Sequence, residues 1–241
     1  MKTTLLIHHH LGLGDHLDCN GMVRWIRKHG WATCYHDQIG VFSKDNYYDM
    51  IEYMYRDDPG ITVFKISRED EYGDVQRIAD SLENSEIIRV GHENYPGKHA
   101  ELSQQKNCWE FFYEQLNMPY EVRSEFFWVD RDYTEERRVY DKLNPKNKDF
   151  IFIHEDPERG FTLNRDHFIN KKLLTVENDI TENIFHFISL IQAASEIHCM
   201  ESSFKTLVDL YALPSQKLFY HDFRNQPLGQ NSLDTWEVVS Y

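Results

Sequence analysis

Short apolar runs alternate along the chain with longer segments in which apolar residues recur at helical spacing. The first run, residues 3–8, predicts a strand, and residues 17–28 predict a helix that follows it and ends at Gly30. Further strands are predicted at 31–37, 60–67 and 85–92, with helices at 45–55 and 71–83. This alternation is typical of parallel strands joined by crossover helices.

The second half of the chain repeats the alternation after an interruption. Residues 94–147 are aromatic-rich and irregular, except for a charged helix predicted at 130–143. Beyond it we expect strands within 150–153, 171–179, 195–203 and 217–223, and helices at 183–194 and 203–213. The sequence therefore predicts an α/β protein with an N-terminal domain at 1–125, a linker helix at 126–148 and a C-terminal domain at 149–241.

The charge balance narrows the classes of function. The 241 residues include 26 Lys and Arg against 40 Asp and Glu, which gives a net charge of −14. Such a chain repels phosphate backbones and anionic lipid surfaces unless a local basic patch intervenes, so we expect no nucleic-acid partner. We expect no transmembrane segment and no secretory leader, which favours a cytoplasmic protein. The four cysteines lack metal-binding spacing, and we expect them to be reduced.

The first strand runs into three consecutive histidines, His8, His9 and His10. This turn fits three kinds of site: a metal site, a dinucleotide site and the first loop of a sugar-transferring enzyme. Because consecutive residues of a strand point to opposite faces, the three rings do not converge easily on one metal ion. We therefore expect no metal, and we expect at least one of these histidines to line a ligand cleft.

The same turn continues through Gly12 and Gly14 to Asp15. The glycines allow the backbone to approach a ligand closely, and Asp15 can cap free N–H groups of the following helix. A carboxylate at this point can also act as a general base towards a hydroxyl. A dinucleotide fingerprint requires a third glycine where the chain has Leu17, so the match to NAD-binding proteins is weak.

Three turns in the second half offer groups that can hold a nucleotide. An arginine followed by a glycine, Arg159, can present a bidentate fork to a diphosphate, or can form a salt bridge with an acidic neighbour. Ser202 and Ser203 lie between a strand and a helix, where they can hold phosphate or serve as an ordinary N-cap. Glu177 and Asn178 can receive a ribose or sugar hydroxyl, or can be plain loop residues. The candidate donor-binding residues are His154, Asp156, Arg159, Phe161, Glu177, Asn178, Glu201, Ser202, Ser203 and Lys205.

Two segments resemble a known group of enzymes. The strand, "LGLGDHL" loop and "NGMVRWI" helix resemble the opening of GT-B type glycosyltransferases, especially the ADP-heptose-using heptosyltransferases. The segment "SEIHCMESSFKTLVDLYAL" is similar to the part of those enzymes that binds the donor diphosphate. The resemblance implies two Rossmann-like domains that face each other across a cleft, with the acceptor on the N-terminal domain and the nucleotide sugar on the C-terminal one.

The same resemblance implies roles for individual residues. Asp15 would be the general base, and Ser202 and Ser203 with Arg159 would bind the diphosphate without a metal ion. The chain departs from the group at residues 200–203, which read "MESS" where the heptosyltransferases usually carry Asp-Thr-Gly or a similar triplet. A heptose donor is therefore not implied.

The sequence thus favours a metal-independent glycosyltransferase. We expect transfer of a hexose or pentose from a nucleoside-diphosphate sugar, with a UDP-sugar as first candidate, to a hydroxyl of a glycan or glycolipid, and no separate cofactor. With Asp15 as base, a single displacement would invert the anomeric carbon. Two alternatives stay open: a nucleotide- or sugar-phosphate-binding protein without transferase activity, and an NAD-dependent oxidoreductase.

Overall fold

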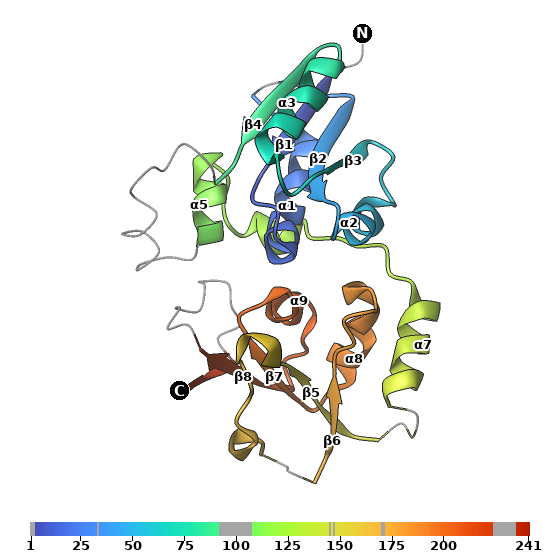
Figure 1. The fold of residues 1–241 in the computed structure, drawn as a ribbon, viewed down its shortest axis with the longest axis vertical. Coiled ribbons are helices and arrows are strands. Elements are labelled where there is room, and N and C mark those ends of the chain that lie inside the picture. The colour runs from blue at the N-terminus through green and yellow to red at the C-terminus, as the bar shows by residue number, and fades with distance from the viewer. Residues whose placement is uncertain are drawn as a thin grey trace. The chain divides into compact units, whose positions relative to one another are not determined.

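The chain forms two compact units, Met1–Asp130 and Arg131–Tyr241, which are described separately here (Figure 1). The computed structural model describes residues 3–32, 34–91, 108–144, 146, 148–169, 172–223 and 235–241. The predicted domain limits at 125 and 148 remain a prediction, as does the predicted cleft. The helix expected as a linker belongs by its contacts to the second unit.

The first unit is built on a four-stranded parallel sheet with the order β3-β2-β1-β4 (Figure 1). Its strands are β1 (Thr4–His8), β2 (Gln38–Lys44), β3 (Ile61–Ile66) and β4 (Ser85–Arg89). The crossover helices are α1 (Leu13–His29), α2 (Tyr48–Tyr55) and α3 (Glu71–Ser81). The predicted alternation of strand and helix in this half is confirmed.

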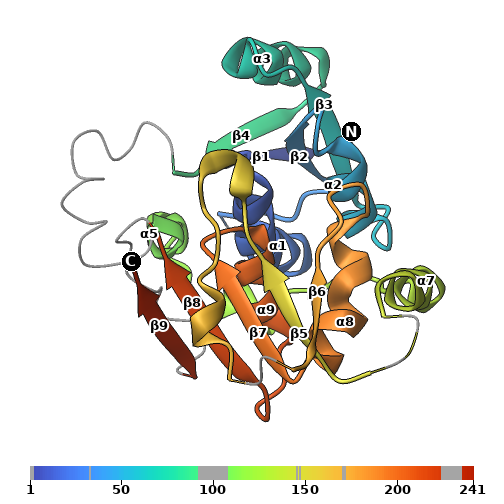
Figure 2. The same cartoon turned by 60° about the horizontal axis from the view of Figure 1, so that its bottom comes forward.

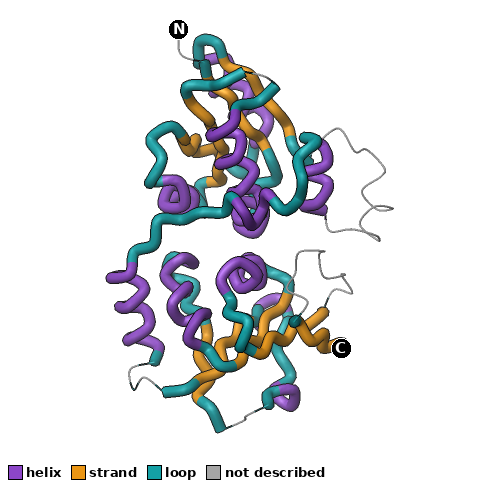
Figure 3. The backbone as a smooth tube through the Cα atoms, turned by 180° about the vertical axis from the view of Figure 1, so that it is seen from behind, coloured by secondary structure: helices purple, strands orange, loops and turns teal. Residues whose placement is uncertain are grey.

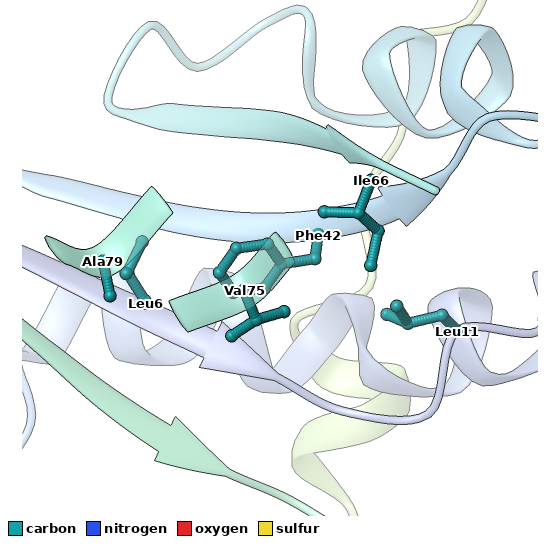
Figure 4. Close-up of a cluster of buried hydrophobic side chains, with 6 residues drawn as sticks. All are labelled: Leu6, Leu11, Phe42, Ile66, Val75 and Ala79. Atoms are coloured by element: carbon teal, nitrogen blue, oxygen red, sulfur yellow. The ribbon is translucent and has the colours of Figure 1, made fainter. Parts of the chain in front are cut away.

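Helix α3 covers one face of this sheet. Val75 and Ala79 of α3 form a buried cluster with Leu6 of β1 and Phe42 of β2 (Figure 4). Burying these side chains removes apolar surface from water, which contributes about 25 cal/mol per Å². Strand β1 is buried on both faces, which explains why its sequence reads as a continuous apolar run.

The second strand differs from the one predicted at 31–37. Trp31 and Cys34 form only an isolated bridge, and Ala32 between them has a φ of 47°, which marks a turn. The strand is instead Gln38–Lys44, where Gly40 interrupted the apolar run in the sequence. A Cβ on Gly40 would lie 2.4 Å from Leu6 Cδ2, so only glycine fits between the neighbouring strands.

Two further helices, α5 (Cys108–Gln115) and α6 (Val122–Glu125), lie in the part of the chain predicted to be irregular. Both pack against α1. Gly21 permits this close approach, since a Cβ there would lie 2.4 Å from the Val122 carbonyl oxygen. Residues 92–107, which include the last residue of the strand predicted at 85–92, lie outside the described residues.

The second unit contains a five-stranded parallel sheet, with the strands side by side in the order β6-β5-β7-β8-β9 (Figure 2). The strands are β5 (Phe150–His154), β6 (Leu174–Glu177), β7 (Glu196–Met200), β8 (Lys217–Asp222) and β9 (Trp236–Ser240). Its helices are α7 (Tyr133–Leu143), α8 (Ile188–Ala193) and α9 (Ser203–Tyr211). Strand β9 was not predicted from the sequence.

The two faces of this second sheet are covered differently. On one face, Phe152 packs against Phe187 and Phe204 of the helical layer. On the other face, Leu163 and Phe168 pack on Ile151 and Ile153. These two residues belong to the connection between β5 and β6, which contains short 3-10 turns at Pro157–Arg159 and Arg165–His167. Polar and charged residues dominate this connection.

Helix α7 packs beside α8 and the preceding 3-10 turn, Ile184–Phe187 (Figure 3). Its N-cap is Asp132, whose carboxylate accepts the backbone N–H groups of Thr134 and Glu135 at 3.1 Å. Asp132 therefore fixes the start of the charged helix that the sequence predicted at 130–143. Among the helices of the described residues, none combines the length and the apolar character needed to cross a membrane.

Candidate functional site

Each sheet has one place where the strand order reverses. In open parallel sheets a ligand binds beyond the carboxyl ends of the strands at this switch point. In the first unit the reversal lies between β1 and β4, and in the second it lies between β5 and β7. The predicted residues around Asp15 follow β1, and those around His154 and Ser202 follow β5 and β7.

Asp15 is the third residue of α1, and each of its carboxylate oxygens accepts an N–H group. Oδ2 lies 3.2 Å from the backbone nitrogen of Gly12, and Oδ1 lies 2.8 Å from the indole Nε1 of Trp109. A Cβ on residue 12 would lie 2.6 Å from Oδ2, so Gly12 makes room for the carboxylate. The predicted capping role is confirmed, and the role as a base remains a prediction.

Trp109 was not predicted as part of this site. It lies on α5, far from Asp15 in the sequence, and reaches it because α5 packs against α1. An indole N–H can only donate, so this contact fixes one oxygen of the carboxylate. No local sequence signal connects the two residues, since the contact depends on tertiary packing alone.

The three histidines make three separate contacts. His8 Nε2 lies 2.9 Å from Glu71 Oε1, His9 Nδ1 lies 2.5 Å from the His10 carbonyl oxygen, and His10 Nε2 lies 2.9 Å from the Gly91 carbonyl oxygen. His8 and His9 are fully buried, whereas His10 is partly exposed. In the described part of the chain no group of three His, Cys, Asp or Glu side chains is arranged to hold a metal ion. The requirement for a metal stays untested.

Glu71, at the start of α3, joins β1 to β2 at the carboxyl edge of the sheet. Its two oxygens contact His8 Nε2 and Lys44 Nζ, each at 2.9 Å. Burial raises the pKa of the Glu71 carboxyl, but hydrogen bonds from Lys44 and His8 outweigh this effect and leave the pKa below its usual value. Glu71 is therefore ionised at neutral pH and satisfied by these two partners.

His16 lies on α1, one residue beyond Asp15, and is fully buried. Neither of its ring nitrogens has a hydrogen-bond partner among the described residues. Burial lowers the pKa of His16 well below its ordinary value, with a smaller contribution from nearby His9. The ring is therefore neutral at physiological pH.

In the second unit, His154 ends β5 at the carboxyl edge. Its Nδ1 lies 2.7 Å from the amide oxygen of Asn178, and its ring packs 4.7 Å from that of Phe204. Burial lowers the pKa of His154, so the ring is neutral and Nδ1 carries the hydrogen. The lone pair is then on Nε2. The structure thus brings together two of the predicted donor-binding residues.

Ser202 is the N-cap of α9. Its hydroxyl oxygen accepts the backbone N–H of Lys205 at 3.3 Å, and its O–H donates to the Met200 carbonyl oxygen at 3.1 Å. The predicted capping role is confirmed. Glu201 precedes this cap, and Ser203 is the first residue of the helix. The first N–H groups of such a helix lack partners within the helix and can bind an anion.

The side chain of Lys205 is not exposed at the carboxyl edge of the second sheet. Its side chain is 4% exposed, and Nζ lies 2.9 Å from the carboxylate of Asp209, which is itself buried. Asp209 also accepts the indole N–H of Trp236 at 2.7 Å. This buried network gives Lys205 a structural role, and its predicted contact with a donor stays a prediction.

Arg159 forms the salt bridge that the sequence offered as an alternative. Asp156 caps the 3-10 turn by accepting the Arg159 backbone N–H at 3.2 Å, and it also pairs with the guanidinium. The Arg159 side chain is 55% exposed and its guanidinium lies 5.6 Å from the ring centre of Phe161. Glu177 ends β6 and is exposed, with Arg165 at 3.5 Å. Arg159 can exchange its partner at little cost because exposed ion pairs contribute only about 0–1 kcal/mol.

Two pockets of the molecule lie away from the predicted residues. One, of about 590 Å³, lies in the first unit between the last turns of α1 and residues 125–128. The other, of about 580 Å³, lies in the second unit and is lined by residues 143, 144, 146, 148, 149 and 172–174. Neither pocket is lined by a predicted site residue.

No protein-family model matches the chain, and no curated protein matches it in sequence. Its fold is similar to that of a glycosyl transferase family 9 protein from Veillonella parvula, with a TM-score of 0.58, 9% identity and coverage of 99% of this chain and 87% of that one. It is also similar to the ADP-heptose LPS heptosyltransferase II of E. coli, with a TM-score of 0.53, 10% identity and coverage of 98% and 90%. A third similar structure is an iron-containing dodecameric glycosyltransferase of enterotoxigenic E. coli, with a TM-score of 0.51, 13% identity and coverage of 91% and 59%. The chain therefore has the GT-B type α/β fold that its sequence predicted, with two parallel sheets.

Proposed function

We propose that the protein is a glycosyltransferase that moves a sugar from a nucleoside-diphosphate sugar to a hydroxyl group of a glycan or glycolipid. One observation carries the proposal. In a GT-B type fold, the carboxylate of Asp15 follows β1 of the first sheet, and the N-terminus of α9 follows β7 of the second sheet. These are the two groups that such a transfer requires, a base for the acceptor and a stabiliser for the departing diphosphate.

Asp15 is the proposed base. It accepts the proton of the acceptor hydroxyl as the hydroxyl oxygen forms a bond with the anomeric carbon, and the bond from that carbon to the diphosphate oxygen breaks. A single displacement of this kind inverts the anomeric centre. The N–H groups of Gly12 and Trp109 hold the carboxylate in place, which supports this role because a base must be positioned before it can react.

The donor is proposed to bind the second unit. The N–H groups at the start of α9, beside Ser202 and Ser203, suit the negative charge that develops on the leaving diphosphate. Arg159 is exposed enough to turn from Asp156 to a phosphate oxygen. Both groups stabilise the leaving group without a metal ion, so we propose a metal-independent reaction.

The remaining predicted residues are proposed to contact the nucleoside or the sugar. His154 offers a lone pair at Nε2, Glu177 offers a carboxylate for a hydroxyl, and Phe161 offers an aromatic face. A UDP-sugar is the first candidate because such donors are common. An ADP-sugar is an equal candidate because a protein of similar fold is named for ADP-heptose.

The proposal is tested by measuring nucleoside-diphosphate release from UDP- and ADP-sugars in the presence of glycan and glycolipid acceptors. The variant Asp15→Asn should abolish transfer while leaving the affinity for the nucleotide nearly intact. Asp45→Asn, at an exposed acidic residue of the same unit, serves as the control and should transfer normally. Equal turnover in Asp15→Asn and the wild type would remove the base assignment. Nucleotide binding without any transfer would favour the binding-protein alternative.

A further inference from the structure

Arg89 differs from the other arginines of the described chain. Every other arginine there lies within ion-pair distance of a carboxylate, whereas Arg89 has no such partner among the described residues. It is only partly exposed, and its Nε is buried without a hydrogen-bond partner. A half-buried guanidinium without a counter-charge is unfavourable, particularly in a chain with a net charge of −14 that has many carboxylates available.

The position of Arg89 in the sheet is specific. It is the last residue of β4 and lies in register with His8, the last residue of β1. The strand order of the first unit reverses between these two strands, so Arg89 stands at the switch point where a ligand is expected. The two side chains share one face of the sheet, because paired residues of parallel strands point the same way.

The groups around Arg89 leave its charge available. The guanidinium carbon of Arg89 lies 6.0 Å from the ring centre of Tyr72, which is at the start of α3 and is 45% exposed. Glu71, the nearby carboxylate, is already bonded to His8 and Lys44. The geometry is that of a cation held against an aromatic ring at the carboxyl end of a strand, with no hydrogen-bond acceptor for its guanidinium among the residues that the structure describes.

We propose that Arg89, with Tyr72 beside it, forms a subsite for a phosphate or carboxylate group carried by the acceptor. The guanidinium binds the anion through paired N–H groups, and the exposed ring of Tyr72 contacts the carbon skeleton that bears the anion. The anion site follows from the geometry of the first unit alone. Its assignment to the acceptor rests on the proposed function, in which the donor phosphates bind the second unit.

The anion site is tested with inorganic phosphate as the probe. Phosphate affinity is measured on the full chain from the concentration dependence of its melting temperature and from phosphorus NMR line broadening. Arg89→Gln should weaken phosphate binding about tenfold, since it removes a charge-assisted contact, and Arg89→Lys should retain part of it. Arg77→Gln, at an exposed arginine of α3 paired with Asp70 and Asp74, is the matched control and should bind as the wild type does.

The possible results separate the claims. Phosphate binding that is absent in the wild type, or unchanged in Arg89→Gln, overturns the anion site. The affinities for ADP and UDP show whether the anion belongs to the acceptor or to the donor. Arg89→Gln should leave both affinities unchanged if the anion belongs to the acceptor. An equal loss of nucleotide affinity would assign the arginine to the donor and overturn the acceptor assignment. Phosphate binding through Arg89 in a protein that binds no nucleotide would leave the subsite standing and reject the proposed function.

Discussion

At the scale of single residues, the sequence indicated Asp15 but could not indicate what holds it. The glycine turn and the helix start are local features, so Asp15 and Gly12 could be predicted together. Trp109 and Arg89 acquire their roles only when α5 packs on α1 and β4 pairs with β1. Capping by Asp15 and Ser202, which was one of two interpretations for each residue, is what the structure contains.

The Trp109 contact predicts a change in turnover. Trp109→Phe keeps the aromatic ring but removes the N–H that holds Asp15 Oδ1, so we expect kcat to fall about tenfold as the base loses its orientation. The donor affinity should not change, because the contact lies in the first unit. Steady-state kinetics at saturating donor measure kcat, and calorimetric titration with the nucleoside diphosphate measures the donor affinity. Trp25→Phe, on the same helix as Asp15, is the control, and a Trp109 variant with wild-type kcat would contradict this role.

The exposed guanidinium of Arg159 predicts a change in donor binding. Arg159→Ala should weaken nucleoside-diphosphate affinity by about 1.5–3 kcal/mol, because a charge-assisted hydrogen bond to the diphosphate is lost. Isothermal titration calorimetry measures this affinity directly. Arg137→Ala, at an equally exposed arginine of α7 that pairs with Asp141, should have no effect. Unaltered affinity in Arg159→Ala would count against its diphosphate role.

At the scale of elements, strands with continuous apolar sequences were predictable and interrupted ones were not. Strands β1 and β5 read as apolar runs because both of their faces are buried. Strand β2 was predicted seven residues early because Gly40 interrupts its apolar run, and the edge strand β9 was missed because only two of its five residues, Trp236 and Val239, are buried. In both cases packing by neighbouring strands, rather than local preference, decides the outcome.

Gly40 gives a prediction about the first sheet. Gly40→Ala should lower the free energy of unfolding by about 2 kcal/mol, because its Cβ would clash with the side chains of Leu6 and Phe64. Urea denaturation measures the change. In the double variant Gly40→Ala/Leu6→Ala, the loss of unfolding free energy should be smaller than the sum of the losses in the two single variants, because the shorter side chain at residue 6 makes room for the new Cβ. Strict additivity, or an unaltered stability of Gly40→Ala, would contradict the close packing.

His16 gives a prediction about pH. Its pKa in the folded protein lies below the unfolded value of about 6.5, so only the unfolded chain binds a proton there as the pH falls. Above about pH 6.5 His16 is neutral in both states and does not affect the free energy of unfolding. Below that pH, protonation of His16 in the unfolded chain lowers the free energy of unfolding by about 1.4 kcal/mol per pH unit. His16→Leu should remove this part of the decline between pH 6.5 and 5, and His29→Gln, at an exposed histidine of the same helix, should not. Identical pH profiles for wild type and His16→Leu would contradict the buried neutral ring.

At the scale of the whole molecule, both sheets carry candidate ligand-binding turns at the point where their strand order reverses, although their strands are connected differently. The first sheet has the order β3-β2-β1-β4 with helical crossovers, and the second places an irregular connection between β5 and β6. Both reverse their order beside a strand whose following turn carries the polar groups singled out in the sequence. The fold class and the positions of these turns could be predicted for that reason, and the roles of their residues stay predictions. The donor base, the sugar and the acceptor depend on contacts that no sequence pattern identifies.

The most direct test of the central claim is nucleotide recognition by the intact chain. Its melting temperature is measured with UDP, ADP, GDP, CMP and NAD, each with and without a metal chelator, since a ligand that binds only the folded state raises the apparent stability. The account predicts that one nucleoside diphosphate raises the melting temperature selectively and that the chelator does not alter the shift. A shift with NAD alone, or with none of the five, would contradict the glycosyltransferase assignment.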